Sequence, residues 1–470
     1  MKQTIITRCS ALFVACVLVV GSTLWPSTAD TAFADVRKAD IIMGDTVDSR
    51  GLSVASCPSI DAEYALVVDA DGTVYFERNA YDATKIASIT KVMTGIVALD
   101  SGPIDTSITV STTAASVGES SAQLTAGDVM TLGDALKALL VSSGNDAAEA
   151  IAETFGAKFL AEQGTNNASP EQCVQAFVDR MNAKAADLKL QDSLFANPHG
   201  LDDGVYAGDH HSCAVDVGTM VRYAMQNQAF RDSVGQPVAA ITVVRGGSKV
   251  TLELQSTDEL LGVFEGACGV KTGFTDAAGP SFAAASNRGA GDLYAVVIHS
   301  SSEAQRFTDA STLLQWVYDH SLDYPLAHSP QTAQMVVNGV TSTVPLAAYV
   351  AQDDWVDVVI PATLADPNAT VPVFSINGNI SQSVHYNTVT GSVRAGDKLG
   401  TISFKQRNKV VATVDLIACE DVAAPNVFED IGVWWDRLFK GLSGKPTVAE
   451  SVLVNETPLL VDKSAPLSMQ

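Results

Sequence analysis

Basic residues are scarce in this chain. Its 470 residues include 29 lysines and arginines against 53 aspartates and glutamates, which gives a formal net charge of −24. Nucleic-acid binding needs clustered lysine and arginine, so this composition argues against a nucleic-acid partner. Apolar residues make up 47% of the chain, so sizeable cores can be buried. The length suits roughly three domains.

Cysteine is also rare. Five of the seven cysteines follow residue 34, namely Cys57, Cys173, Cys213, Cys268 and Cys419. Their spacing matches no zinc-binding pattern, and their odd number leaves at least one thiol unpaired within the chain. His210 and His211 are adjacent, but no third ligand follows them at a spacing typical of metal sites. The sequence therefore predicts no metal site and no cofactor.

Only one long apolar run is evident, near the N-terminus. Residues 11–20 are almost wholly apolar, Lys2 and Arg8 precede them, and the small-x-small triplet at 32–34 resembles a cleavage site. This pattern predicts a signal peptide over residues 1–34 and export across the cytoplasmic membrane. A retained membrane helix is the alternative, but the apolar run is short for a membrane span.

Ser88 and Lys91 form the first candidate catalytic pair. They are three residues apart at the start of a helix that the apolar spacing predicts over residues 88–99. Side chains at this spacing share one helix face, so the amine can take the proton of the hydroxyl and make the serine a nucleophile. Such pairs also arise by chance in long chains, so this one depends on the motifs that follow.

A second motif presents a hydroxyl and a carboxamide together. Ser143 and Asn145 flank Gly144 between helices predicted over residues 131–140 and 147–155. The same three residue types are also typical of an ordinary turn between helices. Taken alone, this motif therefore does not distinguish a site from a connection.

A third motif combines a cation with a hydroxyl. Lys271 and Thr272 lie on a predicted strand that is followed by strands over residues 281–285 and 293–298, which together suggest an antiparallel sheet. A lysine beside a hydroxyl at a sheet edge suits a carboxylate ligand. An edge-strand lysine that merely prevents aggregation is the structural alternative.

Other elements of the first 325 residues follow from periodicity and turn residues. Residues 35–58 are polar and suggest a loose segment. The remaining predictions are a hairpin over 64–76, helices over 172–188, 214–226 and 306–318, and strands over 241–244 and 250–254.

The C-terminal third has a different character. Proline-containing stretches near residues 325–332 indicate a linker, and short strands with turn residues predict a small all-β domain over residues 331–422. A capped helix with an apolar aromatic face is predicted over residues 426–442. It either lies on a membrane surface or packs on its own domain. Residues 443–470 are predicted to be a flexible tail.

Together, the three motifs and their order resemble the penicillin-recognising serine peptidases. Their flanks resemble the D-alanyl-D-alanine carboxypeptidases among the low-molecular-weight penicillin-binding proteins. The stretches that carry the resemblance are Ala87-Ser88-Ile89-Thr90-Lys91-Val92-Met93-Thr94, Ser143-Gly144-Asn145-Asp146-Ala147, Asn197-Pro198-His199-Gly200-Leu201 and Lys271-Thr272-Gly273-Phe274-Thr275. Ile86 departs from the family, which usually has proline there, and this affects the entry to the helix but not the chemistry.

The resemblance implies a fold and a place of action. It covers residues 45–325, where it implies an α+β catalytic domain of the serine β-lactamase/transpeptidase type, an antiparallel sheet with helices. The small all-β domain and the amphipathic helix over 426–442 resemble the family's C-terminal part more loosely, which favours the membrane interpretation of that helix. The implied location is extracytoplasmic, on the outer face of the cytoplasmic membrane or in the cell wall.

The resemblance also implies a role for each motif residue. Ser88 would attack the D-Ala–D-Ala bond of a peptidoglycan stem peptide, with Lys91 as general base. Ser143 would pass the proton to the departing D-alanine, and Asn145 would orient the substrate. The N–H groups of Ser88 and Phe274 would form the oxyanion hole. β-Lactams would acylate Ser88.

The terminal carboxylate of the substrate has its own implied partners. Lys271 and Thr272 would bind it, and Arg306 would lie nearby. Gly273 is also implied to bind substrate. A free lysine has a pKa of about 10.4, so Lys91 needs a lowered pKa to act as a base at neutral pH. Burial and a second cation both lower the pKa of a lysine, and Lys271 is the obvious second cation. We therefore expect both amines to converge on Ser88.

Three other functions remain as alternatives. A serine β-lactamase needs an additional general base, and Glu162 with Asn166 has the spacing of one such element, although Thr165 departs from it. A DD-endopeptidase that cuts cross-links is the second alternative, and the extra β-domain and helix count against it. An inactive scaffold that binds the cell wall is the third, and the presence of every motif residue counts against it.

Overall fold

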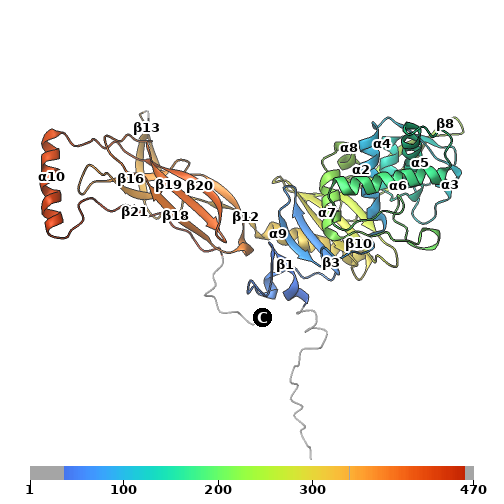
Figure 1. Cartoon of the computed structure of the whole chain (residues 1–470), viewed down its shortest axis with the longest axis horizontal. Helices are drawn as coiled ribbons and strands as arrows, with labels where there is room; N and C mark the ends of the chain where they lie inside the picture. The colour runs from blue at the N-terminus through green and yellow to red at the C-terminus, as the bar shows by residue number, and fades with distance from the viewer. Residues whose placement is uncertain (1–35, 338, 461–470) are drawn as a thin grey trace, which may run out of the picture.

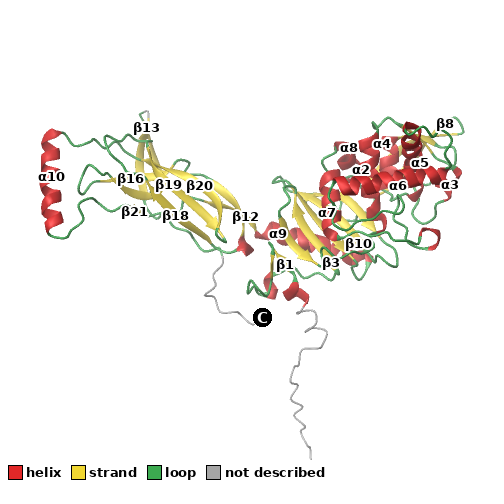
Figure 2. Ribbon diagram, in the orientation of Figure 1, coloured by secondary structure: helices red, strands yellow, loops and turns green. Residues whose placement is uncertain are grey.

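The chain forms two units joined end to end. The computed structural model describes residues 36–337 and 339–460, so the predicted signal peptide lies outside the described residues. Figure 1 shows a helix-and-sheet unit, a β unit, and helix α10 (Val427–Leu442) at the far end of the β unit. Figure 2 shows that strands dominate the second unit and that helices surround the sheet of the first. The predicted fold class, α+β followed by all-β and a C-terminal helix, is confirmed.

An antiparallel sheet organises the first unit. Among the described residues, its spatial order is β2 (Asp45–Thr46), β1 (Ile41–Ile42), β4 (Val74–Arg78), β3 (Tyr64–Asp69), β11 (Asp292–Ile298), β10 (Ser281–Asn287) and β9 (Ala267–Gly273). Strand β9, which carries the third motif, lies at one edge of this sheet.

Helices cover both faces of the sheet. From residue 40 onwards, the helices of the first unit are α2 (Lys91–Ser101), α3 (Thr112–Ser116), α4 (Leu132–Leu140), α5 (Asn145–Glu162), α6 (Pro170–Asp187), α7 (Ala214–Ala224), α8 (Gln228–Val234) and α9 (Glu303–His320). A smaller sheet accompanies them, with strands β5 (Ser107–Thr109), β6 (Val129–Thr131), β7 (Val238–Arg245) and β8 (Ser248–Gln255). Short 3-10 turns are η1 (Val54–Ser56), η2 (Ala87–Thr90) and η3 (Gly204–Tyr206).

The alternation of β3 explains this layering. Leu66 and Val68 pack into the core that contains α2, α5 and α7, whereas Ala65 and Val67 pack into the core under α9. Because successive side chains of a strand point to opposite faces, a strand covered on both faces is apolar throughout. The sheet is thus held between two hydrophobic cores, which fixes the edge strand β9 against the helices.

The segment before β3 is ordered, so the prediction of a loose N-terminal segment is wrong. Arg78 and Asp40 form a buried ion pair at 2.7 Å, and the same guanidinium donates to the carbonyl of Ile60. Ile42 and Val47 are fully buried in the core under α9. This order comes from contacts with β4, which the composition of the segment does not reveal.

The β unit is built from three antiparallel groups. They are β12 (Ser321–Pro325) with β17 (Thr370–Phe374); β13 (Thr332–Val337) with β14 (Val340–Pro345); and a larger sheet of β18 (Ile380–Tyr386), β19 (Lys398–Gln406), β20 (Lys409–Ala418), β16 (Val359–Leu364), β15 (Ala348–Ala351) and β21 (Val452–Leu453). The 3-10 turn η4 (Ser375–Asn377) follows β17. A hydrophobic core of its own, separate from the two cores of the first unit, holds this unit together.

The chain after α10 returns to the β unit, so the prediction of a flexible tail is wrong for residues 452–460. Strand β21 pairs with β15, and the side chain of Asn455 donates to the carbonyl of Leu326 at 3.0 Å. Asn455 is itself buried. A two-residue strand has no periodicity that sequence inspection can detect. Residues 461–470 lie outside the described residues.

Helix α10 presents its apolar face to the outside. Asn426 caps it, and Glu429 completes the predicted capping box. Its apolar side chains are exposed, for example Phe428 at 87% and Trp434 at 58%. No helix of the described residues is long and apolar enough to cross a membrane.

Candidate active site

Ser88 and Lys91 meet at the junction between a tight turn and a helix. The sequence predicts a helix from residue 88, but the structure has the 3-10 turn η2 up to Thr90 and the α-helix α2 from Lys91. Ala87 begins the turn with a φ of 46°, a backbone conformation that is costly for residues other than glycine. The Nζ of Lys91 is hydrogen-bonded to the Oγ of Ser88 at 2.7 Å.

Lys91 is completely buried. Besides Ser88, its Nζ donates to the carbonyl oxygen of His199 at 2.9 Å. Burial is the main cause that lowers the pKa of Lys91 well below its ordinary value, and the positive charge of Lys271 adds to this effect, while Asp146 opposes it. A buried amine next to a hydroxyl, with a lowered pKa, can accept a proton near neutral pH.

The second motif forms the loop between α4 and α5. Ser143 has a φ of 61°, and Asn145 is the first residue of α5. The backbone N–H of Asn145 donates to the carbonyl of Ser120 at 2.8 Å, and its Nδ2 donates to the carbonyl of Gly118 at 2.9 Å. Its buried Oδ1 has no hydrogen-bond partner within the described residues. Such an orphaned acceptor is suited to a donor from a ligand.

The third motif is buried, although β9 is an edge strand. Lys271 is only 1% exposed, which rules out a solvated edge lysine. Its Nζ donates to the carbonyl of Thr272 at 2.9 Å, and the hydroxyls of Thr272 and Thr257 are 2.7 Å apart. Burial, reinforced by the charge of Arg306 and opposed by Asp258, lowers the pKa of Lys271 to about 7.

Strand β9 approaches the serine turn very closely at Gly273. A Cβ atom at this position would lie 2.7 Å from the carbonyl oxygen of Ile86, so a side chain would push β9 away from the turn. Phe274 follows at the rim of the site and is half exposed. Arg306 donates to the carbonyl of Gly273 at 3.3 Å from the second turn of α9, which begins earlier than predicted, at Glu303.

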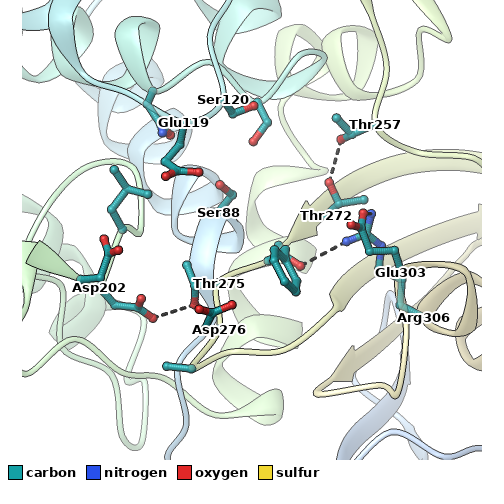
Figure 3. Close-up of a pocket in the computed structure, with 17 residues that line it drawn as sticks. Ser88, Glu119, Ser120, Asp202, Thr257, Thr272, Thr275, Asp276, Glu303 and Arg306 are labelled. Atoms are coloured by element: carbon teal, nitrogen blue, oxygen red, sulfur yellow. Dashed lines mark hydrogen bonds and ion pairs between the residues drawn. The ribbon is translucent and has the colours of Figure 1, made fainter.

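A pocket of about 460 Å³ opens above Ser88. In Figure 3, Ser88 lies between two groups of side chains, with Glu119, Asp202 and Asp276 on one side and Thr272 and Arg306 on the other. Seven of the predicted site residues line the pocket, namely Ser88, Ser143, Asn145, Thr272, Gly273, Phe274 and Arg306. The other two, Lys91 and Lys271, are buried. The three motifs thus come from three separate elements into one place.

Sequence inspection missed several residues of the pocket. Glu119 and Ser120 come from the loop before β6, Thr257 comes from the segment after β8, and Asp202 follows the turn that contains His199. Asp202 accepts a hydrogen bond from Thr275 at 2.8 Å. The only available signal was the position of Asp202 directly after the Asn-Pro-His-Gly-Leu stretch, since the others lie in segments without a motif.

The histidine pair and the cysteines that the sequence analysis considered do not line the pocket. His210 is buried, where its Nε2 lies 2.8 Å from the Oγ1 of Thr90 and its Nδ1 accepts from the N–H of Ala196. Within residues 36–337 and 339–460, no cluster of side chains suits a metal ion. The five cysteines of the described residues are all unpaired.

Glu162 is far from Ser88. It is exposed and ends α5, whose first residue, Asn145, lines the pocket. Seventeen residue steps along a helix at 1.5 Å each separate the two by roughly 25 Å. Glu162 therefore cannot supply the additional base of a β-lactamase at this pocket.

Comparison with known proteins gives a consistent result. The family model described as D-alanyl-D-alanine carboxypeptidase (peptidase S11) matches residues 52–302. D-alanyl-D-alanine carboxypeptidase DacF of Bacillus subtilis (strain 168) is 27% identical over 376 residues, which cover 77% of this chain and 86% of the relative.

Two further similarities cover a smaller share of the chain. A D-alanyl-D-alanine endopeptidase of Pseudomonas aeruginosa is 30% identical over 292 residues, 61% of this chain and 86% of the relative. The crystal structure of the Streptomyces K15 DD-transpeptidase superposes with a TM-score of 0.51 at 27% identity, and the alignment covers 56% of this chain and 98% of that one.

Proposed function

The chain belongs to the D-alanyl-D-alanine carboxypeptidase family of serine peptidases, and we propose that Ser88 is the residue that becomes acylated. The family acts on peptidoglycan peptides that end in D-Ala-D-Ala and binds β-lactams. The observation that carries the proposal is the 2.7 Å hydrogen bond between the hydroxyl of Ser88 and the buried amine of Lys91. A serine without such a base is a weak nucleophile at neutral pH.

Acylation begins with a proton transfer from Ser88 to Lys91. The neutral amine of Lys91 takes the hydroxyl proton while Oγ attacks the carbonyl carbon of the penultimate D-alanine. The carbonyl oxygen becomes negative and is stabilised by the backbone N–H groups of Ser88 and Phe274, because donors fixed in advance need no reorganisation. Ser143 then passes a proton to the nitrogen of the departing D-alanine.

The terminal carboxylate of the peptide is held on the other side of Ser88. Thr272 donates its hydroxyl hydrogen bond, and Lys271 and Arg306 supply positive charge. Gly273 lets β9 approach the turn that carries Ser88. Asn145 orients the substrate amide through its Oδ1, which has no partner among the described residues. Water finally hydrolyses the acyl-enzyme and restores Ser88.

Two alternatives lose support. Against a β-lactamase, Glu162 lies at the far end of α5 from the pocket, so this chain lacks that candidate base for rapid deacylation. Against an endopeptidase, the endopeptidase relative matches 61% of this chain, whereas the carboxypeptidase DacF matches 77% and extends further along it.

A covalent adduct with penicillin tests the proposal. The chain is incubated with a fluorescent penicillin, digested and mapped by mass spectrometry, and release of D-alanine is followed with a diacyl-L-Lys-D-Ala-D-Ala peptide. We expect one adduct on the peptide that contains Ser88, together with D-alanine release. An adduct on another residue, or none in a protein that is folded by circular dichroism, would refute the role of Ser88.

We further propose that different segments of the chain have different functions. Residues 45–325 carry catalysis, residues 331–422 form a spacer of β-structure that residues 452–460 complete, and residues 426–442 bind the outer face of the cytoplasmic membrane. Export would depend on the signal peptide over residues 1–34. The spacer would hold the pocket of Ser88 away from the membrane, since α10 is at the opposite end of the β unit (Figure 1).

The contacts of α10 support the membrane role. Its two basic residues point towards the β unit, because Arg437 donates to the carbonyl oxygens of Asp353 and Trp355, and Lys440 forms an ion pair with Asp357 at 2.6 Å. The apolar face is therefore turned outward and is unable to pack on its own domain. An exposed aromatic face on a short helix is typical of helices that lie in a membrane interface.

Replacement of Trp434 and Trp435 by serine tests this role. Removing two exposed tryptophans from a lipid interface should weaken binding to vesicles of phosphatidylglycerol and phosphatidylethanolamine by about 100-fold. Substitution is preferable to truncation, because the residues after α10 belong to the β unit. The matched control replaces the exposed Val205 and Val263 of the first unit with serine. Equal co-sedimentation of both double variants with vesicles would contradict the proposal.

A further inference from the structure

Two buried polar atoms near the turn that holds Lys91 have no hydrogen-bond partner among the described residues. They are the Nε2 of His199 and the Oε2 of Glu149, and they lie 3.9 Å apart. His199 is completely buried and Glu149 is 6% exposed. Because an unpaired buried polar atom destabilises a fold, this arrangement calls for a compensating benefit. The catalytic steps described above use neither side chain.

The hydrogen bonds of His199 define which ring nitrogen carries the proton. The backbone N–H of Leu201 donates to Nδ1 at 3.2 Å, so Nδ1 must present a lone pair. Burial, together with the charge of Lys91, lowers the pKa of His199 well below its ordinary value, so the ring is neutral. A neutral ring with an accepting Nδ1 carries its proton on Nε2. The Nε2–H group therefore faces the carboxyl group of Glu149.

His199 is also the residue whose backbone holds Lys91. Its carbonyl oxygen accepts from the amine at 2.9 Å. A neutral amine has two N–H bonds and one lone pair. With one N–H directed at His199, rotation about the last bond of the side chain can turn the lone pair towards Ser88. The position of the His199 carbonyl thus determines whether Lys91 can accept the proton of Ser88.

The turn around His199 depends on side-chain contacts. The Oδ1 of Asn197 accepts from the N–H of Gly200 at 2.7 Å, and the Oγ1 of Thr94 donates to the carbonyl of Pro198. The ring of His199 packs edge-on against Tyr206, with 4.5 Å between the ring centres. Glu149 approaches the ring from α5, one helical turn after Asn145. It therefore places a side chain from the first turns of α5 beside the turn that holds Lys91.

We infer that Glu149 and His199 form a positioning pair for Lys91. In the working enzyme, the carboxylate of Glu149 accepts a hydrogen bond from the Nε2–H of His199, and this bond fixes the ring and the carbonyl that orients the amine. Hydrogen bonds of catalytic sites are often long in the empty enzyme and shorten when substrate binds, which suits the 3.9 Å separation. The inference rests on the proposed role of Lys91 as the base.

The protonation of Glu149 connects the pair to pH. Burial raises the pKa of Glu149 to about 7, and the negative charges of Glu153 and Glu171 contribute. Of the titratable groups that face it, His199 is neutral, and burial raises the pKa of Tyr206, so both remain uncharged near neutral pH. Glu149 therefore loses its accepting carboxylate as the pH falls through about 7. The carbonyl oxygen of the resulting carboxylic acid is a weaker acceptor than the oxygen of a carboxylate or a carboxamide.

Two substitutions of Glu149 and one control test the pair. Glu149→Ala removes the acceptor, whereas Glu149→Gln keeps an acceptor oxygen but cannot titrate. Glu153→Gln is the matched control, because Glu153 is the neighbouring buried carboxylate on α5 but bonds Ser111 at 2.8 Å instead of facing His199. The second-order rate of Ser88 acylation by a fluorescent penicillin is measured from pH 5 to 9, together with thermal unfolding.

We expect Glu149→Ala to slow the acylation of Ser88 and Glu149→Gln to retain most of the wild-type rate. Glu149→Ala should acylate at least tenfold more slowly at pH 8, and Glu149→Gln should stay within threefold of the wild type. Below pH 7, the rate of Glu149→Gln should fall less steeply than that of the wild type, because one titrating group is gone. A merely structural role would change thermal unfolding without changing the steepness of the pH profile. Glu153→Gln should keep that steepness and move the acidic limb slightly to lower pH, because one charge that raises the pKa of Glu149 is gone.

The outcomes separate this inference from the proposed function. If the wild type forms its adduct on Ser88 but all three variants share its rate and pH profile, the positioning pair is refuted and the role of Ser88 stands. If the wild type forms no adduct, the proposed function itself has failed. If Glu149→Ala does not fold, ¹⁵N-histidine NMR of the wild type and Glu149→Gln decides. The pair predicts the Nε2–H tautomer for His199 and a shift of that proton resonance in Glu149→Gln, and an unchanged resonance overturns it.

Discussion

Lys91→Arg is expected to slow acylation of Ser88 by about 1,000-fold, because positioned general bases contribute factors of this size. Arginine keeps a long side chain, but its guanidinium does not give up a proton in proteins. The substitution therefore replaces a neutral proton acceptor with a permanently charged donor. The measurement is the rate of labelling by a fluorescent penicillin under conditions in which the wild type reacts to completion.

The matched control for this variant is Lys137→Arg. Lys137 lies on α4, is partly exposed and pairs with Asp134, so its substitution leaves the buried amine intact. Labelling of Lys91→Arg within tenfold of the wild type would show that another group takes the proton of Ser88. Circular dichroism and thermal unfolding of both variants establish that any loss occurs in a folded protein.

Gly200→Ala should damage both the fold and the site. Gly200 has a φ of 91°, and a Cβ atom there would lie 1.9 Å from the carbonyl oxygen of Ala87, in the turn that carries Ser88. Neither backbone can yield easily, since Gly200 is bonded to Asn197 and Ala87 begins the serine turn. We expect a loss of about 3 kcal/mol in unfolding free energy, from backbone strain and the clash together.

Gly204→Ala separates the cost of backbone strain from the cost of a steric clash. Gly204 also has a positive φ, at 54°, but no atom lies within 4 Å of its would-be Cβ. Its substitution should cost about 1 kcal/mol, the cost of placing alanine in the left-handed region, and should leave acylation unchanged. Similar losses of stability and acylation in the two variants would contradict the account of how the turn supports Ser88.

Much of the fold was predictable because its elements are locally encoded. The hairpin of β3 and β4 has two mainly apolar runs around an Asp-Gly turn, and Thr131 caps α4 as its sequence suggests. The capping box of α10 is encoded in the same way. The order of the N-terminal segment and the return of β21 were not predictable. They depend on contacts such as Asp40 with Arg78, which lie far apart in the sequence.

The candidate site was predictable as a set of side chains but not as an environment. Ser88, Ser143 and Lys271 belong to motifs, so the sequence names them. The sequence does not reveal that Lys91 is buried or that it makes a second hydrogen bond. The acceptor of that bond is the backbone carbonyl of His199, and every residue type carries such a carbonyl. The orphaned atoms of Glu149 and His199 likewise depend on how α5 packs on the turn.

Burial also explains why two lysines can share one site. The positive charge of Lys271 lowers the pKa of Lys91, and Arg306 lowers that of Lys271. A positive charge on Lys271 therefore favours a neutral Lys91. The proposed mechanism uses this arrangement, with Lys91 as the base and Lys271 as the cation for a carboxylate. Binding of an anionic substrate would stabilise the ammonium of Lys271 further.

The pH profile of Ser88 acylation in the wild type and in Lys271→Gln tests the central claim most directly. If neutral Lys91 is the base, acylation falls as the pH falls through its lowered pKa, since protonation removes the lone pair. Lys271→Gln removes one of the charges that lower the pKa of Lys91, so the acidic limb of the profile should move to higher pH, whatever happens to the maximal rate. An acidic limb that stays in place or moves to lower pH would contradict the account.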